Sequence, residues 1–314
     1  MTVQLRRWWT LDDVEAGALA ASIAERVGAT LVGVAPHEYA GRPGRTALFE
    51  LRGRRYAFVP GAEAGLGYDG TRFVPTPEQR ESFAVAADEY GLQSGLQEFV
   101  DSMTSPPRTA EVPPMLVSVE AVDAAETPVP PDHPHITELL AKMRGTLRDH
   151  PQPPEITWYQ QARVVLGHDW TVRAAWLIEV PTYGAAVERL AAAGQRLLTP
   201  DEWEYACGAG AATLFRWGDD SPPDDPYSSA TGPHRLPNAF GLEIGQDPYR
   251  DERTADPEVV CGGDGGGMLC GGAGGFLSWL TLATAYRDVE HGRWAHERDG
   301  DASGLLLRPV IPLD

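Results

Sequence analysis

The feature that most constrains the fold is a short segment, residues 195–208, which reads Q-R-L-L-T-P-D-E-W-E-Y-A-C-G and encodes a helix with both of its ends. Thr199 is a favourable N-cap, and Pro200 follows at the first helical position, where its missing N–H costs nothing. Glu202 lies three residues after the cap and completes a capping box. Gly208 is expected to end the helix. The segment therefore predicts one well-defined helix within the main domain.

The same segment resembles R-L-P-T-x-x-E-W-E-Y-A-A, a signature of the formylglycine-generating enzyme and sulfatase-modifying factor family. Later segments resemble the family's Y-P-W-G-D, P-N-x-x-G-L-Y-D, V-x-R-G-G-S-W, A-x-R and G-F-R motifs in the same order. These segments are 215–219, 237–242, 260–263, 285–288 and 304–310. The resemblance implies the family's fold, an α+β domain like that of C-type lectins, loop-rich and low in regular secondary structure. Because a fold does not determine function, the function has to be argued from a site.

The composition limits the class of partner. The 314 residues include 45 acidic and 26 basic ones, which gives a net charge of −19. This charge disfavours nucleic acid and anionic membranes, because both draw on clustered Lys and Arg, and it allows a basic protein partner or a cationic ligand. The 34 glycines and 27 prolines favour a loop-rich protein. With no signal peptide or membrane-length apolar run, and three cysteines, an odd number, a cytoplasmic location is expected.

The periodic patterns of apolar residues divide the chain into an N-terminal extension and a main domain. An apolar stripe at helical spacing predicts a helix over residues 11–27, capped by Thr10, and a strand follows over 30–34. Residues 1–45 are thus expected to form a helix–strand extension packed on a main domain that spans 46–314. Further helices are predicted over 77–90, 96–103, 136–147 and 182–193, and a loop over 125–135. Strands are predicted over 48–51 and 56–59, which should form a hairpin, over 115–122, and over 157–166 and 171–180, which should pair with each other.

Two cysteines fall in the segment that corresponds to the family's active site. The resemblance implies oxidation of a thiol by O₂ at a copper(I) ion held by two cysteine thiolates, and soft thiolates suit this ion. Cys261 and Cys270 are therefore the candidate catalytic residues and copper ligands. The family's second cysteine position falls on Gly275 instead. The alternative is that both cysteines are partly buried thiols without a ligand role.

Four further residues are expected to line a substrate pocket. Asp264 stands where the family has a serine, and Trp279, Tyr286 and Arg287 lie on a segment expected to be a strand beside the family's substrate groove. Arg287 could pair with a ligand carboxylate through two parallel hydrogen bonds. The alternative for Arg287 is an ion pair with an acidic residue of the protein itself.

The family's calcium-binding G-N-x-W-E-W segment is not retained, since residues 245–250 read G-Q-D-P-Y-R. Oxygens of Asp247, Asp251 and Glu252 could form a hard-cation site of their own, or an exposed acidic turn. Two functions are open. The first is a copper-dependent oxidase acting on a thiol, a peptide or a small molecule. The second is a non-catalytic ligand- or protein-binding module, of an immunity or adaptor type, on the same scaffold.

Overall fold

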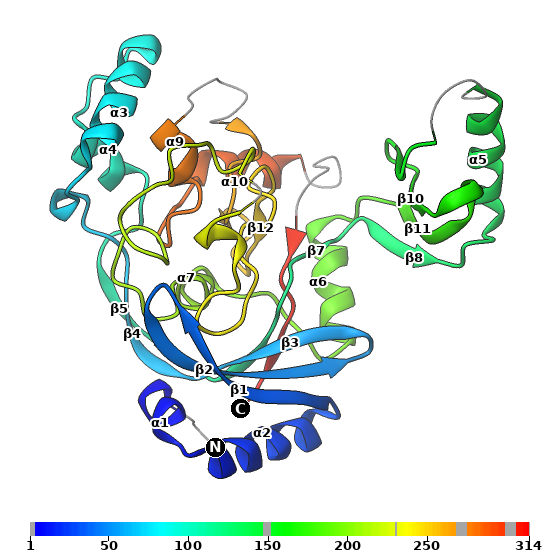
Figure 1. Cartoon of the computed structure of the whole chain (residues 1–314), viewed down its shortest axis with the longest axis horizontal. Coiled ribbons are helices and arrows are strands. Elements are labelled where there is room, and N and C mark those ends of the chain that lie inside the picture. The colour runs from blue at the N-terminus through cyan, green and yellow to red at the C-terminus, as the bar shows by residue number, and fades with distance from the viewer. Residues whose placement is uncertain (1–3, 147–151, 230, 268–274, 299–305, 314) are drawn as a thin grey trace. The chain divides into compact units, whose positions relative to one another are not determined.

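The computed structural model describes residues 4–146, 152–229, 231–267, 275–298 and 306–313 (Figure 1). Its contacts divide the chain into two compact units. The first comprises Met1–Val122, Val187–Glu297 and Gly304–Asp314, and the second Asp123–Ala186 and Arg298–Ser303. The boundary expected between residues 45 and 46 falls inside strand β2, so the chain does not divide there.

The first unit contains an antiparallel five-stranded sheet in the order β1-β2-β3-β6-β15. Its strands are β1 (Thr30–Tyr39), β2 (Arg42–Leu51), β3 (Arg54–Val59), β6 (Met115–Ser118) and β15 (Val310–Pro312). The hairpin expected over residues 48–59 is confirmed by the pairing of β2 with β3. Strand β1 is longer than expected, because the turn that ends it lies at Ala40 and Gly41, both with positive φ.

Alternating side chains on β3 face two different parts of the hydrophobic core. Tyr56 and Phe58 pack on the side of two N-terminal helices, whereas Ala57 and Val59 pack with Trp203 on the other side. The helices are α1 (Leu5–Thr10) and α2 (Asp13–Val27), and Trp203 belongs to α7 (Pro200–Gly208). Figure 1 shows α1 and α2 (dark blue) together on one side of the sheet. The sheet therefore lies between these helices and α7.

Helix α2 begins two residues later than expected. Asp12 caps it, because the Asp12 carboxylate accepts a hydrogen bond from the Glu15 N–H and the Glu15 carboxylate accepts one from the Asp12 N–H. Thr10, the expected cap, is instead the last residue of α1. The end of α2 at Gly28, in the left-handed conformation, is as expected.

Helix α7 starts as the sequence predicts but ends one residue later. Thr199 and Glu202 form the expected capping box. Gly208 is still helical, and Ala209 takes the left-handed conformation with a φ of 46°. A Cβ at Gly208 would lie 2.7 Å from the Thr284 side chain. The glycine is therefore required for close packing rather than for ending the helix.

A further part of the core gathers around three helices. They are α3 (Pro77–Tyr90), α4 (Leu96–Ser102) and α9 (Gly275–Leu280). The cap of α3 at Thr76 and its end at Gly91 agree with the sequence. Trp279, expected on a strand, lies in α9 instead and is buried among the aromatic residues of this cluster.

Shorter elements complete the first unit: β4 (Ala62–Leu66) pairs with β5 (Arg108–Val112), β12 (Glu252–Arg253) pairs with β13 (Val260–Cys261) and β14 (Leu306–Leu307), and α10 (Val289–Glu297) follows. Between residues 209 and 251 the described chain has no strand, and its one helix is a 3₁₀ turn (Pro233–Arg235). The predicted shortage of regular structure is wrong for the described chain as a whole, most of which is helix or strand, and it holds only for this stretch.

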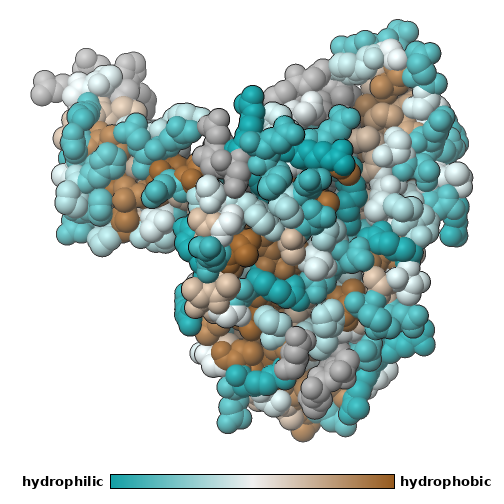
Figure 2. Space-filling view, turned by 180° about the vertical axis from the view of Figure 1, so that it is seen from behind, coloured by the Kyte–Doolittle hydropathy of each residue, from teal (hydrophilic) through white to brown (hydrophobic). Residues whose placement is uncertain are grey.

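The described helices include none long and apolar enough to cross a membrane. Figure 2 shows one face of the molecule, where hydrophobic residues form separate groups among hydrophilic ones.

The second unit is an antiparallel sheet with one helix. The strands, in the order β8-β11-β10-β9, are β8 (Glu126–Val129), β9 (Glu155–Trp158), β10 (Ala162–Leu166) and β11 (Val172–Ile178), and the helix is α5 (Pro134–Thr146). The strand expected over 157–166 is interrupted by a turn with a positive φ at Gln160.

The loop predicted over 125–135 is wrong in part, because β8 lies within it. The strands predicted over 157–166 and 171–180 were expected to pair, and the antiparallel pairing of β10 with β11 confirms this. Strand β7 (Val122–Asp123) and helix α6 (Tyr183–Ala192) lie where the units meet in sequence.

Candidate functional site

Cys261, the expected catalytic cysteine, is a buried residue of β13 with no exposed surface. Burial raises the pKa of its thiol to about 12, although the positive charge of Arg287 acts in the opposite direction. The Arg287 Nη1–H group donates to its Sγ atom over 3.5 Å. Cys261 is therefore a protonated thiol at neutral pH, and a copper ion bound there would have to displace this contact.

The expected partner of Cys261 cannot be placed, because Cys270 lies outside the described residues. Cys207 of α7 is also a buried free thiol, and burial raises its pKa to about 11. Cys207 could not be placed near the expected site from the sequence, because it lies 54 positions before Cys261. The two cysteines belong to the same part of the hydrophobic core.

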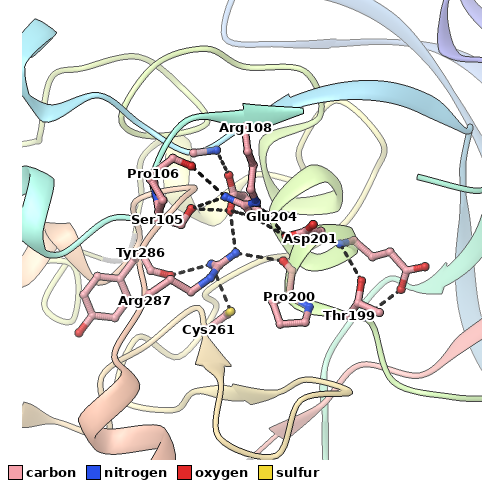
Figure 3. A network of polar contacts seen from close by, with 12 residues as sticks. Ser105, Pro106, Arg108, Thr199, Pro200, Asp201, Glu204, Cys261, Tyr286 and Arg287 are labelled. Carbon is pink, nitrogen blue, oxygen red and sulfur yellow. Dashed lines mark hydrogen bonds and ion pairs between the residues drawn. The ribbon is translucent and has the colours of Figure 1, made fainter. Parts of the chain in front are cut away.

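Arg287 pairs with a carboxylate of the protein rather than presenting itself to a ligand. Its Nη2–H group donates to Glu204 Oε2 over 2.6 Å and to the Pro200 carbonyl over 3.0 Å, as Figure 3 shows. Arg287 also donates to the carbonyl of its neighbour Tyr286. The side chain of Glu204 is only 2% exposed. The alternative given for Arg287 from the sequence, an internal ion pair, is thus the arrangement found.

Glu204 is the centre of a larger network. Its Oε2 atom accepts further hydrogen bonds from Ser105 Oγ and Arg108 Nη2, both over 2.9 Å, and its Oε1 atom accepts one from the Gly67 N–H. Arg108 also pairs with Asp201. Two carboxylates are thus balanced by two guanidinium groups. The network joins α7, β5 and the segment after α9 (Figure 3).

A cavity of about 300 Å³ opens beside this network, between β4 and α7. Most of its wall consists of alanine, glycine and leucine side chains. Its polar groups come from Glu63, Tyr68, Glu204, Tyr205, Thr213 and Thr284. Arg108 and Arg287 are not among the residues that line it, because both guanidinium groups are turned toward carboxylates. A cavity of this size with few polar groups is typical of a small-molecule site.

The other expected pocket residues are buried and engaged by the protein. Trp279 has no exposed surface, and its indole N–H donates to the Asp224 carbonyl over 2.7 Å. Tyr286 is 1% exposed, and its hydroxyl lies 3.4 Å from Asp288 Oδ2. Asp264 is 3% exposed and accepts a hydrogen bond from the Gly266 N–H over 2.7 Å. None of the three opens onto the cavity.

A histidine that the sequence analysis did not single out lies close to Asp264. The Nε2 atom of His291 contacts an oxygen of Asp251, which is 1% exposed, and a Cβ at Gly265 would meet the imidazole ring. This contact raises the pKa of His291, and the nearby Asp288 and Asp264 act in the same direction against the effect of burial. Because His291 and Asp251 lie 40 positions apart and belong to no common motif, the sequence could not predict that they meet.

The contact between His291 and Asp251 predicts a pH-dependent stability. Because the pKa of His291 is raised above 6.5, its contribution is complete below about pH 6.5 and is lost as the pH rises through the folded-state pKa. Between pH 5.5 and 8.5, the free energy of unfolding of the wild type should fall relative to that of His291→Gln. His296→Gln, on the exposed side of the same helix, is the control and should follow the wild type. Parallel curves for the wild type and His291→Gln would contradict the prediction.

The three carboxylates proposed for a hard cation have separate partners. Both oxygens of Glu252 accept hydrogen bonds from Arg308, Asp251 contacts His291, and Asp247 accepts one from the Tyr249 N–H. Among the described residues there is no group of three or more His, Cys, Asp or Glu suited to a metal ion. The expectation of calcium therefore gains no support from these side chains.

Comparison with known protein families finds no family model that matches this chain, and comparison with curated proteins finds no match either. The family resemblance thus stays a prediction carried by its motifs.

Proposed function

We propose that the protein is a non-catalytic binding module that holds a small organic molecule in the cavity between β4 and α7. The observation that carries this proposal is the cavity itself, which lies beside the rigid Glu204 network. Two guanidinium groups, those of Arg108 and Arg287, together with the Ser105 hydroxyl and the Gly67 N–H, hold the Glu204 carboxylate in place before a ligand arrives. Such preorganisation lowers the cost of binding.

The state of the expected redox residues supports binding over oxidation. Cys261 has no exposed surface, and its Sγ atom already accepts a hydrogen bond from Arg287. Arg287, Trp279 and Tyr286 are occupied by contacts within the protein.

Filling the cavity should abolish ligand binding without unfolding the protein. Gly65 lines the cavity, and a Cβ built there meets nothing within 4 Å, so Gly65→Ile places its side chain in open space. Gly33→Ile, at another strand position with the same clearance, is the matched control. The probes are cyclohexylamine, cyclohexanol and cyclohexanecarboxylate, each at about ten times its dissociation constant, where the melting temperature should rise by about 2 °C.

At least one probe should bind the wild type and Gly33→Ile and fail to bind Gly65→Ile, as measured by thermal shift and calorimetry. If every probe that binds the wild type also binds Gly65→Ile with the same affinity, the cavity is not the site.

A copper-dependent oxidase is the second candidate. It is favoured by one contact, that of Arg287 with Cys261, which brings an expected substrate-binding residue to an expected copper ligand. The test is a titration of the reduced protein with Cu(I) against a competing chelator. One-to-one binding that is lost in both Cys261→Ser and Cys270→Ser would support the oxidase. If the wild type does not bind Cu(I), the oxidase is ruled out.

A further inference from the structure

We draw no further inference here: the strongest candidate, the outward face of α3, where the exposed carboxylates of Glu78, Glu81, Asp88 and Glu89 lie around the exposed side chain of Val85, is a cluster of acidic residues, and nothing in the described part of the chain shows what covers it.

Discussion

Replacing Arg308 by methionine should lower the free energy of unfolding of the first unit by about 3–5 kcal/mol, because it leaves a buried carboxylate without its cation. Arg308 is 1% exposed, and its guanidinium donates to both oxygens of Glu252 over 2.7 and 2.6 Å. It also donates to the carbonyls of Ser118, Val119 and Glu243, which join β6 and the 243–252 segment to β14. Urea denaturation followed by tryptophan fluorescence measures the change.

Arg55→Met is the matched control for this experiment. Arg55 also contacts Glu243, and its main partner is Glu120, but half of its side chain is exposed. Exposed ion pairs contribute about 0–1 kcal/mol, so this variant should lose little. The double variant Arg308→Met with Glu252→Leu should recover most of the loss, since no uncompensated charge remains. Equal losses for Arg308→Met and Arg55→Met would show that burial of the pair is not what matters.

Gly292→Ala should destabilise the protein by about 2 kcal/mol, although alanine is the better helix former by about 1 kcal/mol. Gly292 lies within α10, and a Cβ there would be 2.0 Å from the Glu258 carbonyl oxygen, which belongs to the backbone and cannot turn away. The helix would have to move off the segment that precedes β13. The measurement is the midpoint of urea denaturation.

Gly17→Ala makes the same change in α2, where a Cβ meets nothing within 4 Å, and it should stabilise by about 0.5–1 kcal/mol. Opposite signs for the two variants would confirm that close packing, not helix propensity, decides the effect at Gly292. A stabilising Gly292→Ala would contradict the placement of α10.

Local signals in the sequence predicted local structure well. The cap of α7 at Thr199 and the ends of α3 at Thr76 and Gly91 depend on residues within four positions of one another, and the structure contains them. The errors come from competition between neighbouring signals. Thr10 and Asp12 are both good caps, and the choice of Asp12 depends on Glu15, which completes the capping box.

The candidate site was less predictable, because its contacts are distant in sequence. The motifs identified Arg287 and Cys261 but not that Glu204, 83 positions before Arg287, takes up the guanidinium. Arg108 comes to Glu204 from 96 positions away, and nothing in its own neighbourhood indicates this. Charge balance within a buried network is a property of the packed structure, so periodicity and spacing cannot reveal it.

The arrangement of the two units along the chain also has a consequence for biosynthesis. Almost all of the second unit is one continuous segment, Asp123–Ala186, which leaves the ribosome as a whole. The first unit is assembled from separate segments, and its sheet needs β15 to pair with β6 across nearly 200 residues. Until Arg308 has been synthesised, the nascent chain has no cation for Glu252 in the position that the finished structure uses. Translation therefore imposes an order of folding. The second unit can fold while the chain is still being synthesised, whereas the sheet of the first unit is completed only after β15 has left the ribosome.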